Sequence, residues 1–297
     1  MKKILVHLHI YYKEQTDMFA KKINSSLNRY DYDLFVTIRE HDEEIEQKFL
    51  SFKPDTEFVI TENIGADIYP FTYVLNLINL EDYDYLVKLH TKKIYDKFEA
   101  VGEFNKYKVP FKYWNEYLIS FLSPHNMKKI IKNFKQNKNL GMVANYRLIA
   151  NESTNLPKSC KIAYDAAKEL IEKQNIHCEN LIYPAGTMFV ARASIFNLVK
   201  QLNLNASNFQ EFSSYAGKPV SIFPYAMERF IGNCANANGL LTKDVYTPKL
   251  QIFMLDITLQ INSISSFIFS IRRVGEKKIK VVKIFNITIK ELDKGKL

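Results

Sequence analysis

Four consecutive polar residues follow an apolar stretch in the sequence YDYLVKLHTKK, residues 83–93. The stretch 85–89 is mostly apolar and predicts a buried strand, whose carboxyl end presents His90, Thr91, Lys92 and Lys93. An imidazole, a hydroxyl and two ammonium groups can together stabilise the negative charge that grows on a departing nucleotide diphosphate, a role that a divalent metal takes in other enzymes. The alternative interpretation is that the lysines form a solvated turn after the strand.

A second candidate site lies in NIGADIYPF, residues 63–71. Gly65 permits a positive φ or a close approach of the backbone to a ligand. Asp67 directly precedes a predicted helix, and the free N–H groups at a helix N-terminus bind an anion or accept a carboxylate cap. A simple helix cap is therefore the alternative role for Asp67.

A third stretch, YPAGTMFVAR at residues 183–192, contains small residues inside an apolar run. Ala185, Gly186 and Thr187 leave space where a bulky ligand can approach the backbone. The structural alternative is a bulge in a core strand.

A fourth stretch, PYAMERFIG at residues 224–232, places Glu228 and Arg229 among apolar neighbours. An apolar setting disfavours the charged form of an unpaired carboxyl group and suits a general base. The alternative is an ordinary Glu–Arg pair on a helix surface.

Strands and helices alternate along the first part of the chain. This alternation predicts an α/β fold with a doubly wound, mainly parallel sheet and flanking helices. Ligands of such sheets bind beyond the carboxyl ends of the strands, where residues 63–67 and 90–93 are expected. The expected strands are 4–11, 32–38, 57–61, 83–89, 140–145 and an interrupted run at 181–192, and the expected helices are 16–27, 43–52, 69–80, 114–137 with a break at Pro124, 163–173 and 224–237.

The composition narrows the classes of partner. The 297-residue chain carries a formal net charge of +9, which indicates an anionic partner. Because lysine is spread along the chain and no nucleic-acid-binding module is recognisable, we do not expect nucleic acid to be that partner. Three widely spaced cysteines predict neither a disulfide framework nor a zinc site. No run reaches the length of a membrane span, so a cytoplasmic protein is expected.

The sequence changes character after residue 248. We therefore expect a main domain at 1–248 and a basic, aromatic extension at 249–297. The extension interleaves aromatic and β-branched residues with lysine and arginine. Two interpretations stay open: a terminal β-hairpin packed on the main domain, and a surface that meets anionic lipid at the inner face of a membrane.

The order of these motifs resembles the rhamnan synthesis protein F family, whose members act in building bacterial cell-surface polysaccharides. The motifs are N-x-G-x-D-x-x-P-F at 63–71, Y-D-Y-x-x-K-L-H-T-K-K at 83–93, Trp114 in a helix, L-G-M-V at 140–143, A-G-T-M-F-x-x-R at 185–192, and Glu228-Arg229. The resemblance covers roughly residues 1–240.

The resemblance implies a GT-A-like, Rossmann-type glycosyltransferase domain. Many enzymes of that class hold Mn²⁺ or Mg²⁺ with an Asp-x-Asp motif after the fourth strand, whereas the corresponding position here reads Leu89-His90-Thr91-Lys92. No metal-ligand set is therefore expected, the cations are expected to replace the metal, and dependence on a divalent metal stays an open question.

The resemblance also implies roles for individual residues. The nucleotide and its diphosphate would contact His7, His9, Tyr11, Asn63, Gly65, Asp67, His90, Thr91, Lys92 and Lys93. The donor sugar and the acceptor would contact Ala185, Gly186, Thr187 and Tyr225. Glu228 would be the general base, with Asp67 as the competing candidate, and Arg229 would orient Glu228 or contact phosphate.

The function implied is transfer of a sugar, with inversion, from a nucleotide-sugar donor to a growing surface polysaccharide or a lipid-linked acceptor. The donor would be a dTDP-, UDP- or GDP-sugar, and rhamnose is the sugar that the family name suggests. The alternative is a sugar- or nucleotide-binding partner of a polysaccharide synthesis complex without catalysis of its own.

Overall fold

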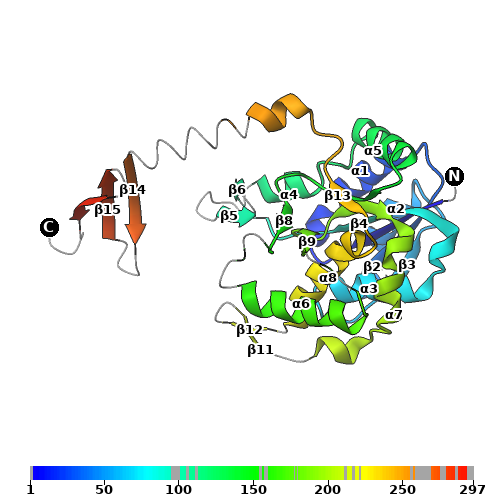
Figure 1. The fold of residues 1–297 in the computed structure, drawn as a ribbon. Coiled ribbons are helices and arrows are strands. Elements are labelled where there is room, and N and C mark those ends of the chain that lie inside the picture. The colour runs from blue at the N-terminus through cyan, green and yellow to red at the C-terminus, as the bar shows by residue number, and fades with distance from the viewer. Residues whose placement is uncertain are drawn as a thin grey trace. The chain divides into compact units, whose positions relative to one another are not determined.

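The computed structural model divides the chain into two compact units, Met1–Tyr246 and Thr247–Leu297 (Figure 1). It describes residues 3–94, 101–104, 107–110, 113–153, 156, 160–176, 178, 180–210, 213–215, 218–220, 222–254, 257, 269–274, 279–284 and 287–292. Much of the predicted extension at 249–297 therefore lies outside the described residues, including Lys277 and Lys278.

A seven-stranded sheet forms the centre of the first unit, with the order β13-β7-β10-β4-β1-β2-β3. Its strands are β1 (Lys3–His9), β2 (Tyr32–Ile38), β3 (Glu57–Ile60), β4 (Tyr83–His90), β7 (Leu140–Val143), β10 (Phe189–Arg192) and β13 (Leu241–Lys243). All neighbouring pairs are parallel except those that β10 makes with β4 and β7. The predicted mainly parallel sheet is confirmed.

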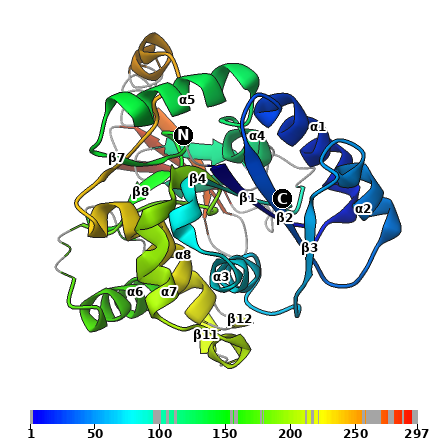
Figure 2. The same ribbon diagram turned by 90° about the vertical axis from the view of Figure 1, so that its right-hand side faces the viewer.

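Helices cover both faces of this sheet. Figure 2 shows α1 and α5 over one face, and α3 and α8 over the other. The predicted flanking helices are thus confirmed, and the sheet and helices together form a Rossmann-like α/β fold. The helices are α1 (Thr16–Leu27), α2 (Glu43–Leu50), α3 (Ile68–Leu77), α4 (Trp114–Leu118), α5 (Pro124–Gln136), α6 (Lys161–Lys173), α7 (Asn197–Gln201) and α8 (Phe223–Ala237), with 3-10 turns at Lys13–Gln15, Leu80–Asp82, Ala193–Phe196 and Ala206–Phe209.

Local sequence signals explain several of these boundaries. Asp42 caps α2 by accepting a hydrogen bond from the backbone N–H of Ile45 at 3.2 Å. Ser123 caps α5 in the same way through the N–H of Asn126, and Pro124 occupies the first turn, where its missing N–H is harmless. The predicted break at Pro124 is therefore the boundary between α4 and α5.

The apolar run at 181–192 folds into two strands that belong to different sheets. β9 (Ile182–Pro184) pairs with β8 (Ile149–Asn151) in a separate two-stranded sheet, whereas β10 joins the central sheet. Gly186 and Thr187 between them have φ values of +82° and +49°. This left-handed turn takes the chain from one sheet to the other, so it is not a bulge within one strand.

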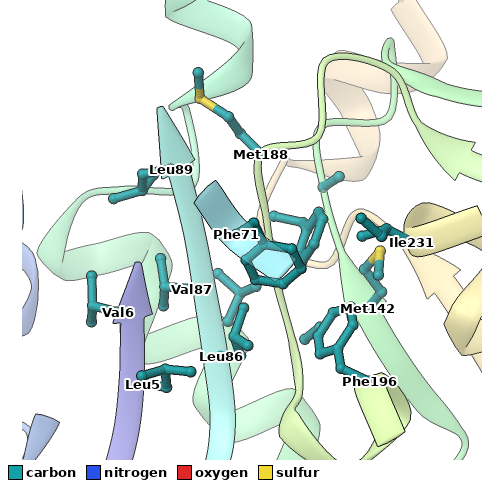
Figure 3. Packing of buried hydrophobic residues seen from close by; sticks show 14 of the residues in the cluster. Leu5, Val6, Phe71, Leu86, Val87, Leu89, Met142, Met188, Phe196 and Ile231 are labelled. Atoms are coloured by element: carbon teal, nitrogen blue, oxygen red, sulfur yellow. The ribbon is translucent and has the colours of Figure 1, made fainter. Parts of the chain in front are cut away.

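The core lies on both sides of the central strands. Leu5, Val6, Leu86 and Val87 are fully buried, as expected for parallel strands that are covered on both faces (Figure 3). Phe71 from α3 packs on the sheet with its ring centroid 5.5 Å from that of Phe196.

The remaining strands form small antiparallel sheets. In the first unit these are β5 (Val101–Phe104) with β6 (Tyr107–Pro110), and β11 (Ser213–Tyr215) with β12 (Lys218–Val220). The second unit contains a three-stranded sheet of β14 (Phe269–Val274), β15 (Ile279–Ile284) and β16 (Ile287–Leu292). Among the described residues, no helix is both long enough and apolar enough to cross a membrane.

The order of the parallel strands reverses next to β1. From β1 the chain continues to β2 and β3 on one side, and then returns to place β4 on the other side of β1. Such a switch point leaves a crevice beyond the carboxyl ends of the two strands, where ligands of open α/β sheets bind.

Candidate functional site

A pocket of about 430 Å³ lies at this switch point. That volume falls within the range of roughly 300–1,000 Å³ that is usual for small-molecule sites. The chain ends of β1 and β4 and the segment before α3 supply its walls. The lining residues are His9, Tyr11, Tyr12, Asn63, Ala66, Asp67, His90, Thr91, Lys92 and Lys93. The structure thus brings together most of the residues that the sequence proposed for nucleotide and diphosphate; Tyr12 was not among them.

Asp67 is the anchor of the polar cluster beside the pocket. Its Oδ2 accepts hydrogen bonds from Lys88 Nζ at 2.6 Å and from Thr187 Oγ1 at 2.6 Å. Lys88 Nζ also donates to the carbonyl oxygen of Thr187 at 3.2 Å. Although Asp67 stands at the N-cap position of α3, its side chain makes no capping hydrogen bond. The helix-cap alternative for Asp67 is therefore wrong.

The charges in this cluster keep Asp67 ionised. Burial alone would raise the pKa of the Asp67 carboxyl, but the neighbouring His90 ring and the positive charges of Lys88 and Lys92 outweigh it and hold that pKa well below its usual range. Burial lowers the pKa of Lys88, and Asp67 opposes this shift. The side chain of Lys88 has no exposed surface, so its ammonium has lost its hydration. The ion pair with Asp67 compensates this desolvation cost, which would otherwise destabilise the fold in full.

His90 lies beside this ion pair and has no hydrogen bond. It is 2% exposed, and neither ring nitrogen has a hydrogen-bond partner in the described part of the chain. Its Nδ1 is 3.3 Å from Asp67 Oδ2. Burial holds the pKa of His90 well below its usual value, with Lys88 and Lys92 acting in the same direction and Asp67 against it. The ring is therefore neutral near pH 7.

His7 and His9 project from the same face of β1 and share one partner. His7 Nε2 is 3.1 Å and His9 Nδ1 3.0 Å from Thr37 Oγ1. His9 lines the pocket, and burial lowers its pKa to about 4. His7 lies deeper in the core, with its ring centroid 5.6 Å from that of Phe71. The prediction that His7 lines the pocket is corrected, because it stands two residues before the end of the strand.

Thr91 shapes the pocket wall through the backbone. Its Oγ1 accepts hydrogen bonds from the N–H groups of Tyr11 at 2.8 Å and Tyr12 at 2.9 Å. These bonds hold the segment after β1 against the end of β4. Thr91 therefore has a positioning role, in addition to any contact with phosphate.

Lys92 has a fixed backbone and an ammonium group without a partner. The Gln15 side chain donates from Nε2 to the carbonyl oxygen of Lys92 at 2.6 Å and accepts its N–H at 3.2 Å. No hydrogen bond or ion pair of the Lys92 ammonium occurs among the residues that the structure describes. Lys93 is exposed at the pocket rim. The pocket is thus lined by Lys92, whose backbone is held by Gln15, and by the exposed Lys93.

Gly65 and Ala66 bring the backbone to the pocket in left-handed conformations. Their φ values are +62° and +52°. A side chain on Gly65 would overlap the ring of Phe209 and the Cβ of Tyr69. Packing therefore fixes Gly65, while Asn63 and Ala66 line the pocket itself.

Glu228 does not line the pocket but holds the turn behind it. The residue is half-buried on α8, and its Oε1 accepts the backbone N–H of Gly186 at 2.7 Å. The next residue, Thr187, is hydrogen-bonded to Asp67. The two candidate bases, Glu228 and Asp67, are therefore hydrogen-bonded to adjacent residues of one turn.

The small residues of that turn are covered by protein. Ala185, Gly186 and Thr187 are buried. A Cβ added to Gly186 would lie 2.6 Å from Leu118 Cδ2 and 3.1 Å from Trp114 Cζ2. The space beside the turn therefore belongs to α4, and the prediction that these three residues face donor sugar and acceptor is corrected.

Arg229 is engaged away from the pocket. Its Nε and Nη2 donate to the two carboxylate oxygens of Glu152, each at 2.6 Å, and Nη1 donates to the carbonyl of Tyr225 at 3.0 Å. Tyr183 donates its hydroxyl to the same Glu152 at 2.8 Å. The described hydrogen bonds of Arg229 go to Glu152 and to the carbonyl of Tyr225, while Glu228 acts on it through its charge, so its predicted roles toward phosphate and Glu228 stay predictions. Sequence reasoning missed Glu152, because nothing in the sequence around it indicates a buried partner.

The residues around the pocket do not form an evident metal site. Among the described residues, no group of three or more His, Cys, Asp or Glu side chains stands ready to hold an ion. Mg²⁺ and Mn²⁺ prefer several oxygen ligands. One carboxylate already paired with an ammonium does not match that preference.

A mainly parallel sheet flanked by helices, with a pocket at its switch point, defines a Rossmann-like α/β protein. Within that class, the chain belongs to the rhamnan synthesis protein F family, whose family model matches residues 1–239. The membership supports a role in polysaccharide synthesis in bacteria.

Two curated relatives from Xanthomonas campestris pv. campestris are similar to part of the chain. Both are named "Uncharacterized protein WxcX", one from strain B100 and one from strain ATCC 33913. Each is 29% identical over 183 residues, which cover 60% of this chain and 24% of the relative. The chain therefore spans about a quarter of the length of the curated relatives that it matches.

Proposed function

We propose that the chain is a glycosyltransferase that moves a sugar from a nucleotide-sugar donor to a growing bacterial surface polysaccharide or a lipid-linked acceptor. The observation that carries the proposal is the pocket at the β1–β4 switch point, near the N-terminus of α3. It is lined by the Lys92 ammonium and the buried His90 ring, neither of which has a hydrogen-bond partner among the described residues. These groups suit a diphosphate, which is the part that all the candidate donors share.

The diphosphate would lie between Lys92 and the start of α3. The helix is ten residues long, and the positive end of its dipole lies beside Ala66 and Asp67. Lys92 supplies a full positive charge to the negative charge that develops as the sugar leaves. In this arrangement the Lys92 ammonium and the N-terminus of α3 stabilise the diphosphate charge that a metal ion stabilises in many GT-A enzymes.

The nucleoside would occupy the side of the pocket formed by the end of β1. Tyr11 is 48% exposed and packs edge-on against Tyr12, with ring centroids 4.9 Å apart. An exposed aromatic ring provides a face for a base or a sugar. Asn63 offers both a donor and an acceptor to the edge of the nucleotide.

Glu228 would act as the general base in an inverting transfer to an acceptor that approaches from the side of α8, since Glu228 does not line the donor pocket itself. The acceptor hydroxyl attacks the anomeric carbon and gives its proton to Glu228, while the bond from that carbon to the diphosphate oxygen breaks. The Gly186 N–H fixes one oxygen of Glu228, and the other oxygen makes no hydrogen bond within the described residues. Asp67 is a weaker base, because its neighbours lower its pKa and its Oδ2 is already bonded.

A thermal-shift screen tests the donor site. dTDP, UDP, GDP and CMP are each added with EDTA and with Mn²⁺, because a ligand that binds the folded state raises the melting temperature. We expect one diphosphate to raise it in EDTA. A shift that requires Mn²⁺ would keep the glycosyltransferase and contradict the role of the lysine, whereas no shift with any nucleotide would contradict the proposed donor site.

Turnover then separates catalysis from binding alone. Glu228→Gln is expected to keep donor affinity near normal and to abolish transfer, while retained turnover would move the base to Asp67.

Lys92→Ala is expected to weaken diphosphate binding by tenfold or more, with Lys128→Ala, an exposed lysine of α5, as the matched control. Binding without breakdown of any sugar nucleotide would favour a non-catalytic partner of a synthesis complex.

A further inference from the structure

His90 is a buried histidine whose ring nitrogens are both unused. Its ring is almost fully enclosed, lines the pocket and has no hydrogen bond within the described part of the chain. A buried polar group without a hydrogen-bond partner destabilises the folded protein. Since the ring lines a pocket, a ligand can supply the missing partner.

The groups that face His90 come from each element packed around it. Asp67, at the start of α3, has its Oδ2 3.3 Å from Nδ1 of His90. Lys88 and Lys92 flank it along the chain of β4, and His9 is its partner in the register of β1. Of these, Asp67 is the one carboxylate, and Lys88 and Thr187 already hold it in place.

We propose that His90 takes up a proton when the diphosphate of the donor enters the pocket, with Nδ1–H directed at Asp67 and Nε2–H donated to the diphosphate. The inference rests on the proposed function. It makes His90 a group that changes its charge during the reaction cycle.

Electrostatics supplies the reason for the uptake. In the free protein, burial and the two nearby lysines keep the ring neutral. A diphosphate in the pocket adds negative charges beside the ring, and a nearby opposite charge favours the charged form of histidine. The positive charges of Lys88 and Lys92 oppose protonation of His90 in the free protein. In the complex, the negative charge of the diphosphate compensates them.

The added proton would assist departure of the sugar. When the bond between the anomeric carbon and the diphosphate oxygen breaks, the electron pair stays on that oxygen and the diphosphate gains one negative charge. The acceptor proton goes to Glu228. The proton on His90 comes from solvent, stays on the ring and strengthens its hydrogen bond to the more negative product.

Isothermal titration calorimetry tests the uptake directly. The nucleoside diphosphate that binds most tightly among UDP, dTDP and GDP is titrated into the full chain at pH 7.0 in HEPES and in Tris, whose ionisation enthalpies differ. The His90→Gln variant lacks the titratable ring, so its proton exchange on binding measures the contribution of the nucleotide itself. His41→Gln removes an exposed histidine far along the chain from the pocket residues and is the matched control.

We expect the wild type and H41Q to take up close to one proton more per nucleotide than H90Q. The dissociation constant of the wild type should also rise by up to tenfold per pH unit above pH 7, and that of H90Q should change less. If H90Q binds too weakly to measure, ¹⁵N spectra of the histidine rings in the wild type give the same information, since one ring should change from the neutral to the charged pattern on addition of nucleotide.

The outcomes separate this inference from the function on which it rests. Nucleotide binding with equal proton exchange in wild type and H90Q, or with every buried ring still neutral, would overturn the role of His90 and leave the glycosyltransferase proposal intact. Failure of all three diphosphates to bind would overturn both.

Discussion

Among single residues, Lys88 holds the polar cluster together. Its ammonium lies in the middle of the central sheet, yet it reaches Asp67 and Thr187, which come from α3 and from the turn before β10. A lysine is rarely buried without a partner. The three contacts explain how a charged residue is accommodated between Val87 and Leu89 in a strand that otherwise reads as apolar.

Replacement of Lys88 by methionine should destabilise the fold strongly. Lys88→Met leaves the Asp67 carboxylate buried without its cation, and breaking a buried pair in this way costs about 3–5 kcal/mol. Urea denaturation measures the free energy of unfolding. The double variant Lys88→Met, Asp67→Asn removes both charges and should recover much of the loss. Equal losses in the single and double variants would show that charge pairing is not the cause.

The stability of the protein should fall as the pH is lowered below 6.5. The pKa of His9 is about 4 in the folded state and 6.5 in the unfolded chain, so the unfolded chain binds a proton that the folded state excludes. This contribution is complete above pH 6.5 and is lost as the pH falls to about 4. One such shift corresponds to about 3 kcal/mol, and His7 and His90 shift in the same direction.

The slope of stability against pH measures this effect. Between pH 6.5 and 4, His9→Gln should reduce the slope by the equivalent of one proton, and His41→Gln should leave it unchanged. A slope that is identical in His9→Gln and wild type would contradict the burial of His9 as its cause.

The sequence predicted residues whose role is local and missed those whose role depends on distant partners. Asp67, His90 and Lys92 follow strand ends or precede a helix, and a strand end is visible in the hydrophobic pattern. Lys88 and Glu152 acquire their roles from partners that the chain brings back over many residues. No spacing rule links such pairs before the fold is known.

At the scale of elements, the turn from β9 to β10 connects the two candidate bases. Asp67 holds Thr187, Glu228 holds Gly186, and α4 closes over the outside of the turn. The sequence signalled the interruption of the strand, because glycine and small residues break an apolar run. It did not show that the turn would be buried, since α4 packs on it from another part of the chain.

Substitution of Gly186 by alanine should damage this element in two ways. A positive φ costs an L-residue about 1–2 kcal/mol, and the added methyl group would overlap Leu118 and Trp114. Overpacking of this kind adds about 1–3 kcal/mol. Gly239→Ala is the matched control, because its φ is +69° and nothing lies within 4 Å of the added carbon.

Denaturant unfolding of the two alanine variants separates strain from overlap. Gly239→Ala should lose only the cost of the backbone conformation, and Gly186→Ala should lose clearly more. Glycosyl transfer should also fall in Gly186→Ala, since the N–H that fixes Glu228 moves with the turn. Equal losses of stability in the two variants would contradict the close packing of α4 on Gly186.

Elements with a clear period were predicted well from sequence, and short ones were not. α1 and β2 have the predicted bounds, because a clear apolar pattern runs along each of them. The strands β8, β9 and β13 have three residues each. Such a short strand shows no periodicity, and its pairing is decided by the tertiary structure.

At the scale of the whole molecule, the positive charge is distributed unevenly between the two units. Residues 247–297 contain ten Lys and Arg side chains and four Asp and Glu side chains, a net charge of +6 out of +9 for the whole chain. The first unit, which holds the pocket, therefore carries a net charge of only +3. Most of the net positive charge therefore belongs to the unit that does not hold the pocket.

Removal of residues 247–297 should abolish attraction to anionic vesicles without loss of the pocket. Each basic residue near such a surface contributes about 1 kcal/mol, and salt screens the interaction. In sedimentation assays, we expect the full chain to bind vesicles that contain phosphatidylserine and to dissociate in 0.5 M salt. Residues 1–246 should stay in the supernatant and keep the same thermal shift with nucleotide. Equal binding of both proteins to the vesicles, or binding of the full chain to purely zwitterionic vesicles, would show that the basic extension is not the contact with the membrane.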